Sequence, residues 1–185
     1  MRPVRPIRSG RRKTEQMSLT PRARDLLARN ATYARDVHEG SLPSKPRRRI
    51  AIVTCMDARI DPLAMIGLQL GEGHVIRNAG GVITDDVVRS LCLSQRTLGT
   101  REILLVHHTD CGLQNLDEEA FVDLLREDAR QGPPWSVQAF TDPYDDVRAS
   151  MRRLEDDPFV AHTDQMLGFV HDVSDGLLHV VDQSD

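Results

Sequence analysis

The sequence predicts a three-layer α/β/α fold with a mostly parallel central sheet and a C-terminal antiparallel hairpin. Residues 50–54 and 101–107 each contain a run of aliphatic residues, which is typical of short strands buried on both faces. Segments with apolar residues three and four positions apart alternate with these strands, as expected for amphipathic helices. Such alternation predicts parallel strands joined by helices that cover both faces of the sheet.

The N-terminal part begins with a predicted helix. Thr20 supplies a capping hydroxyl, Pro21 suits the first helical turn, and a moderate apolar stripe continues to Gly40. Residues 41–49 form a Pro- and Arg-rich linker, which leads into the first strand at residues 50–54.

Capping and turn residues place the later elements. Asp61-Pro62 predicts a helix start, and this helix is expected to run to Gly71. A Gly turn at residues 174–176 separates the two strands of a terminal hairpin. In chain order, the other elements are a strand at 74–77, a turn at 78–81, a helix at 84–98, a strand at 101–107, a helix at 117–130, a loop at 131–142, a helix at 143–156 and hairpin strands at 167–173 and 177–181.

Charge separates an N-terminal extension from the rest of the chain. Residues 1–49 carry 14 Lys and Arg against four Asp and Glu, whereas the remainder carries 10 against 24. Prolines interrupt the arginines of residues 1–16, which therefore lack an apolar face and are expected to form a disordered basic extension. We expect residues 17–49 to supply an N-terminal helix and linker, and residues 50–185 to form the α/β catalytic domain. No nucleic-acid partner is expected, because a block of like charge is usually a solvated tail.

Cysteine content and hydropathy indicate a reducing compartment. The chain has three cysteines, an odd number without the even spacing of a secreted disulfide framework. No apolar run approaches the roughly 18 residues that a membrane-spanning helix needs. We therefore expect a cytoplasmic protein with free thiols and no membrane partner.

Two short segments carry the residues best suited to chemistry. Cys55 directly follows one predicted strand, and His108 and Cys111 follow another. The carboxyl ends of parallel strands meet at one edge of a sheet, so these three side chains can converge there. Two sulfurs and an imidazole are ligands that zinc prefers, and three protein ligands leave a fourth position open for catalysis.

His107 and Cys92 are weaker candidates for a metal site. Neighbouring side chains of a strand alternate between faces, so His107 should point away from His108 and act as a core histidine or a hydrogen-bond donor to the site. Cys92 lies in a predicted amphipathic helix between Leu91 and Leu93, where a buried structural thiol is expected. His108 is therefore favoured as the ligand.

The order and spacing of three motifs make the chain similar to the β-class carbonic anhydrases. The resemblance extends from about Leu19 to the end of the chain, and Ala58 departs from it because many members have serine there. The motifs that carry it are Cys55-Met56-Asp57-Ala58-Arg59, Arg77-Asn78-Ala79-Gly80 and His108-Thr109-Asp110-Cys111-Gly112.

This resemblance implies a zinc enzyme. It implies one zinc ion (Zn2+) per subunit held by Cys55, His108 and Cys111, and reversible hydration of CO2 to bicarbonate and a proton through zinc-bound hydroxide. It also implies a catalytic pair, in which Asp57 orients the hydroxide and Arg59 holds Asp57. In some members the equivalent aspartate swings onto zinc, so Asp57 is a conditional fourth ligand. Two thiolates offset the charge of zinc, so we expect the bound water to have a pKa above about 7 and activity to rise with pH.

The resemblance further implies a turn and an assembly. The turn formed by Asn78, Ala79, Gly80 and Gly81 is expected to border the substrate or to support the metal-binding loop. Family members are generally dimers or multiples of dimers, so a homodimer or higher homo-oligomer is expected. Its small-molecule partner would be CO2 or bicarbonate.

Three alternatives use the same residues differently. A hydrolase of carbon disulfide or carbonyl sulfide has a similar fold and ligand set. It would differ in which substrate can reach the site. A non-catalytic zinc-stabilised binding protein would not need Asp57 and Arg59. An enzyme with a nucleophilic Cys55 would leave the spacing between His108 and Cys111 unexplained.

Overall fold

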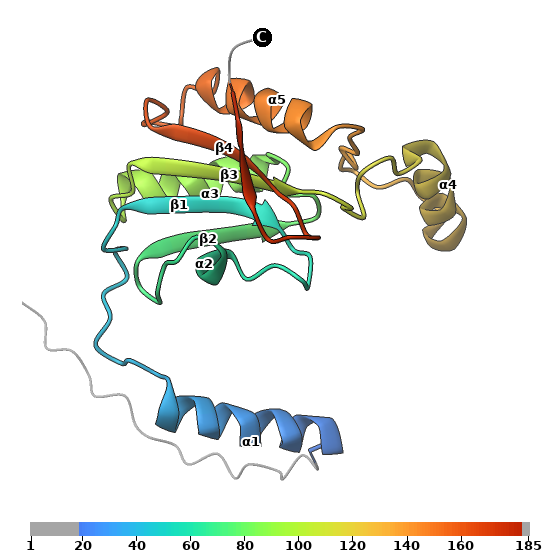
Figure 1. The fold of residues 1–185 in the computed structure, drawn as a ribbon. Coiled ribbons are helices and arrows are strands. Elements are labelled where there is room, and N and C mark those ends of the chain that lie inside the picture. Colours follow the sequence, from blue (N-terminus) through green and yellow to red (C-terminus); the bar gives the residue numbers. More distant parts are fainter. Residues whose placement is uncertain (1–18, 183–185) are drawn as a thin grey trace, which may run out of the picture. The chain divides into compact units, whose positions relative to one another are not determined.

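The computed structural model describes residues 19–182, and Figure 1 shows its fold. The chain divides between Leu42 and Pro43 into two compact units. The basic extension expected at residues 1–16 lies outside the described residues.

The first unit contains helix α1, Pro21–Asp36. Thr20 caps it as predicted, because its hydroxyl accepts a hydrogen bond from the Ala23 N–H at 3.2 Å. The helix ends before the expected Gly40, since Val37 departs from helical geometry with φ −127°. None of the residues of α1 is buried.

The second unit is built on a five-stranded sheet with the order β2-β1-β3-β4-β5 (Figure 1). The first four strands run parallel, and β5 pairs antiparallel with β4. The mostly parallel sheet and its C-terminal hairpin are therefore confirmed. The strands are β1 (Ile50–Cys55), β2 (Gly73–Asn78), β3 (Glu102–His108), β4 (Met166–His171) and β5 (Leu178–Val181).

Helices lie against both faces of this sheet. Helices α3 (Asp85–Arg96) and α5 (Pro143–Glu155) pack on one face, where their apolar residues form a core with Val53. The short α2 (Pro62–Met65) and the residues that follow it pack on the other face, against Ile52. Successive side chains of β1 thus enter opposite layers, as the pleat of a strand requires. No helix among the described residues is long and apolar enough to cross a membrane.

The helix expected to reach Gly71 is wrong in length, because α2 ends at Met65. Gly67 adopts a left-handed conformation with φ 69°, and the Leu68 N–H donates back to the Leu63 carbonyl at 2.9 Å. This arrangement closes the helix. Leu63 and Leu68 still pack against the sheet, so the apolar pattern indicated burial correctly but not helical length.

Helix α4 (Glu118–Ala129) forms close to its predicted bounds but buries none of its residues. Asp117 caps it by accepting from the Ala120 N–H at 3.0 Å. Leu124 on its apolar side is 54% exposed. The apolar side of α4 is therefore only partly covered by the described residues.

Gly168 sets the spacing between β4 and α5. A Cβ at this position would lie 2.5 Å from Val147 Cγ1 and 3.0 Å from Met151 Sδ, and both side chains are buried. We expect Gly168→Ala to lower the free energy of unfolding by about 1–3 kcal/mol, because a packed core cannot accept an extra methyl group without strain. Urea denaturation followed by circular dichroism measures this change.

Gly132→Ala is the matched control, because only the flexible Arg126 side chain lies near that position. An unchanged unfolding free energy for Gly168→Ala would show that α5 moves away from the sheet without cost.

Candidate active site

The carboxyl ends of β1 and β3 bring the two sequence motifs together. The strands pair in parallel with Thr54 opposite Val106, so Cys55 and His108 lie at the same edge of the sheet. Cys111 completes the group, because the ligand atoms of the three side chains all lie within 4.8 Å of one another. The two sulfur atoms are 3.9 Å apart.

This donor set fits a tetrahedral metal ion such as zinc. The Nδ1–H of His108 donates to the Thr109 carbonyl at 2.9 Å, and this leaves the lone pair of Nε2 free. Nε2 is buried and has no hydrogen-bond partner among the described residues. Two sulfurs that each lie about 2.3 Å from one tetrahedral zinc ion would be about 3.8 Å apart, close to the observed separation.

The electrostatics of the ligand group favour a thiolate at Cys55. Hydrogen bonding between the two sulfurs lowers the pKa of Cys55 and raises the pKa of Cys111, as expected when one thiol donates to the other as thiolate. Burial opposes this lowering at Cys55, while the backbone N–H groups of Asp57 and Gly80 support it. For His108, burial acts to lower the pKa, but the Cys55 sulfur and the Asp57 carboxylate outweigh it and the pKa is raised. The group therefore contains one thiolate, at Cys55, which a cation would stabilise.

Asp57 and Arg59 form a bidentate ion pair beside the ligand group. Arg59 Nε and Nη2 donate to the two carboxylate oxygens of Asp57 at 3.0 and 2.8 Å, and the Arg59 backbone N–H donates to Oδ1 at 2.9 Å. These hydrogen bonds hold the pKa of Asp57 well below its usual range and raise the pKa of Arg59. Asp57 Oδ2 lies 3.9 Å from His108 Nε2. An ionised carboxylate is thus held at the edge of the ligand group.

The turn at residues 78–81 supports the loop that carries Cys55. The Asn78 carbonyl accepts a hydrogen bond from the Met56 N–H at 2.8 Å. Gly81 has φ 75°, and a Cβ there would lie 3.0 Å from the backbone nitrogen of Cys55. Only glycine fits this approach of two backbones.

A cavity of about 520 Å³ adjoins this turn and the ligand group. Apolar side chains such as Met56 and Leu113 face the same cavity as the Asp57 carboxylate. The arrangement can hold a small uncharged molecule beside a fixed negative charge. The lining residues are Cys55, Met56, Asp57, Ala58, Ala79, Gly80, Cys111, Gly112 and Leu113.

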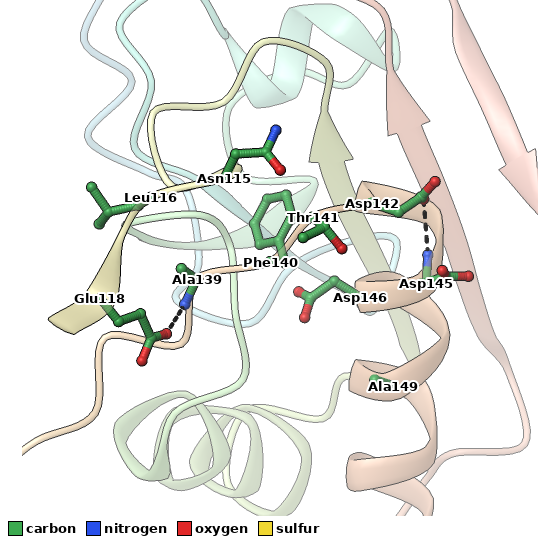
Figure 2. Close-up of a pocket in the computed structure, with 10 residues that line it drawn as sticks. All are labelled: Asn115, Leu116, Glu118, Ala139, Phe140, Thr141, Asp142, Asp145, Asp146 and Ala149. Carbon is green, nitrogen blue, oxygen red and sulfur yellow. Dashed lines mark hydrogen bonds between the residues drawn. The ribbon is translucent and has the colours of Figure 1, made fainter.

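His107 lies outside the ligand group, toward α5. Its Nε2 is 2.6 Å from Asp146 Oδ2, and its ring centroid is 5.4 Å from that of Phe140. Figure 2 shows Asp146 on the first turn of α5 and Phe140 in the preceding loop, both lining a second cavity of about 430 Å³. The two adjacent histidines therefore have different surroundings, as the alternation of strand side chains predicts.

Three side chains that contact these residues were not predicted to have a role. Arg77 donates to the backbone carbonyls of Cys55 and Asp57, at 2.9 and 2.7 Å, and Asp110 accepts from Arg59 at 2.7 Å. Arg77 and Asp110 lie inside the sequence motifs, so their positions in the sequence already indicated that they lie near the site. Asp146 lies 39 residues from His107, and no local pattern links the two.

The structural thiol expected at Cys92 packs against the core but is not fully buried. Cys92 is only partly buried, and it packs at the margin of the core beside Leu93, which is 50% exposed. The apolar stripe of α3 is narrower than the sequence indicates, so Cys92 lies at its edge.

Comparisons with known proteins agree on one family. A family model described as carbonic anhydrase matches residues 50–128, which include both motifs and the turn. Beta-carbonic anhydrase 1 of Mycobacterium tuberculosis is 50% identical over 157 residues, which is 85% of this chain and 96% of that protein. A carbonic anhydrase structure from Streptococcus mutans superposes with a TM-score of 0.82 and 36% identity, over 89% of this chain and 99% of the other. A carbon disulfide hydrolase of Saccharolobus solfataricus is 46% identical over 66 residues, covering 36% of this chain and 32% of that protein.

The contact between His107 and Asp146 predicts a loss of stability on substitution. We expect Asp146→Ala to lower the free energy of unfolding by about 1–3 kcal/mol, because it leaves the buried His107 nitrogen without a partner. Chemical denaturation measures this change.

Asp145→Ala is the matched control, since Asp145 lies in the same helical turn and pairs only with Arg148 at the surface. An exposed pair of this kind contributes at most about 1 kcal/mol. Equal effects of the two substitutions would assign the loss to the helix terminus rather than to His107.

Proposed function

Because the chain belongs to the β-carbonic anhydrase family, we propose that it catalyses the reversible hydration of CO2 to bicarbonate and a proton. One observation carries this proposal: a three-ligand group lies beside the ion pair of Asp57 and Arg59. A structural metal site needs ligands alone, whereas a reaction needs a polar group placed beside them.

We assign one zinc ion per subunit to Cys55, His108 and Cys111. The free Nε2 of His108 and the 3.9 Å separation of the sulfurs support this assignment. A zinc ion held there would supply Lewis acidity, and because two thiolates would offset its charge, it would acidify water less than a carbonic anhydrase site with three histidines, where the pKa is about 7. Asp57 is assigned as a conditional fourth ligand, since its carboxylate lies 3.9 Å from His108 Nε2.

The side chains around the ligand group orient the reactants. Asp57 is ionised, so it accepts a hydrogen bond from the attacking water and directs a lone pair of that oxygen toward the substrate. Arg59 keeps Asp57 ionised and in place through its two side-chain hydrogen bonds. The apolar wall that includes Met56 and Leu113 suits CO2, which is small and uncharged.

The turn at residues 78–81 is proposed to serve this site in two ways. Asn78 and Gly81 hold the loop that carries Cys55 in position, through a hydrogen bond and a close backbone approach. Ala79 and Gly80 line the cavity next to the ligand group.

Hydrolysis of carbon disulfide is the second candidate activity. It is favoured by the identity of 46% to a carbon disulfide hydrolase, but that match covers only 36% of this chain. The ligand group alone does not separate the two reactions, because both substrates are small, linear and uncharged. Parallel assays with the two substrates on one preparation distinguish them.

The proposed reaction is tested by stopped-flow CO2 hydration with zinc analysis of the same sample. We expect one zinc ion per subunit and a rate that rises between about pH 6.5 and 9, because water acidified by such an ion would ionise in this range. Asp57 does not contribute to this rise, since its lowered pKa keeps it ionised throughout. Asp57→Asn is expected to reduce the rate about 10- to 100-fold, the usual cost of removing a group that orients a metal site.

Asp86→Asn is the matched control, because Asp86 also pairs with an arginine, Arg89, but on the exposed surface of α3. The proposal fails if zinc-loaded protein hydrates no CO2, or if Asp57→Asn keeps the wild-type rate.

A homo-oligomer, with a dimer as the smallest unit, is part of the proposal. On α1, Leu26, Leu27 and Tyr33 are each more than 40% exposed, and a second copy of the chain is the surface proposed to cover them. Leu26→Glu with Leu27→Glu is expected to lower the mass measured by sedimentation equilibrium, because it places charge in that contact. An unchanged mass would exclude α1 from the interface.

A reducing, cytoplasmic setting is also part of the proposal, because metal binding requires that the thiols of Cys55 and Cys111 are not oxidised to a disulfide.

A further inference from the structure

Arg59 joins the two loops that carry the metal ligands. Its Nε and Nη2 bond to the Asp57 carboxylate, at 3.0 and 2.8 Å. On the side of the second motif, Nη1 donates to Asp110 Oδ2 at 2.7 Å, and Nη2 donates to the Asp110 carbonyl oxygen at 2.9 Å. All three nitrogens of the guanidinium are therefore engaged.

The backbone of Asp110 is suited to this double contact. Asp110 lies between His108 and Cys111 and has φ 54°, in the left-handed region. Aspartate and asparagine occupy this region more readily than most residues other than glycine. Both the main chain and the side chain of Asp110 thus accept hydrogen bonds from one guanidinium.

The second anchor restrains the exposed partner of the ion pair between Asp57 and Arg59. The Asp57 side chain is 17% exposed but the Arg59 side chain is 47% exposed, so water competes for the guanidinium and a further contact restricts it. The guanidinium is planar and rigid, so fixing one edge of it orients the other edge as well. Asp57 Oδ2 lies only 3.9 Å from the free nitrogen of His108, so a small rotation would carry the carboxylate among the ligand side chains.

We propose that Asp110 is a positioning residue, which fixes the Arg59 guanidinium and thereby holds the Asp57 carboxylate beside the three ligand side chains rather than among them. Asp110 touches neither the substrate nor the reacting atoms and acts through Arg59. The inference rests on the proposed CO2 hydration for its consequence, and on the four hydrogen bonds of Arg59 for its geometry.

The first test observes Arg59 directly in the full-length, zinc-loaded protein. The Nε–H of Arg59 gives a resolvable ¹H–¹⁵N signal, which is assigned by its loss in Arg59→Lys. Asp110→Asn removes the charge and keeps the shape, and Asp110→Gly removes the side chain and accepts the same φ. We expect faster exchange of the Arg59 Nε–H with water in both variants, because the guanidinium has lost the carboxylate of its outer anchor and keeps only the contact with the Asp110 carbonyl.

The second test is a double-mutant cycle on CO2 hydration. Asp110→Asn is expected to lower kcat/KM about 3- to 10-fold in the wild-type background, a coupling typical of charged groups in contact. In an Arg59→Ala background the same substitution should have no effect, since Asp110 has nothing left to position. Asp123→Asn, which breaks a surface pair with Arg126, is the matched control and should change neither measurement.

The outcomes separate this inference from the proposed function. If the wild-type protein hydrates no CO2, the proposed function fails, and the exchange of the Arg59 Nε–H still decides the role of Asp110. Wild-type exchange and wild-type kcat/KM in both Asp110 variants would overturn the inference. A loss of equal size with and without Arg59 would also overturn it, because Asp110 would then act by another route.

Discussion

The parallel pairing of β1 and β3 is the constraint on which the whole site depends. It brings the ends of two segments that lie about 50 residues apart to one edge of the sheet, where Cys55 meets His108 and Cys111. The hydroxyl of Thr54 reinforces the pairing, since it donates to the Val106 carbonyl at 2.8 Å inside the core. A shift of this register by one residue would turn the ligands to opposite faces.

Around this edge the site balances opposite charges at short range. Two sulfurs lie 3.9 Å apart in a buried setting, an arrangement that a shared proton or a metal cation stabilises. Asp57 adds a carboxylate, and Arg59 offsets its charge. Arg77 contributes without entering the ligand group, because it donates to the backbone carbonyls of Cys55 and Asp57. Cations therefore set the position of the loops, and the ligand side chains remain available for metal.

Much of this architecture could be predicted from the sequence, because the relevant signals are local. Strand ends and helix caps depend on neighbouring residues. The caps Thr20 and Thr84, for example, each accept a hydrogen bond from the N–H three residues later. The length of α2 could not be predicted, since the apolar residues after it reach the sheet without helical geometry. The contact of Asp146 with His107 also escaped prediction, because it depends on how α5 packs against β3. Asp110 could be found in its motif, but its contact with Arg59 could not be predicted, because it depends on how the loops after β1 and β3 lie relative to each other.

The close approach of Gly81 to Cys55 has a consequence for how this enzyme can change. A Cβ at Gly81 would lie 3.0 Å from the backbone nitrogen of Cys55, so backbone atoms, and not side chains that could be exchanged for others, limit the approach there. The position of the Cys55 sulfur should therefore depend little on substitutions of side chains in the hydrophobic core. Variation in substrate preference is expected instead at cavity walls made of exposed side chains, such as Met56, which is 65% exposed.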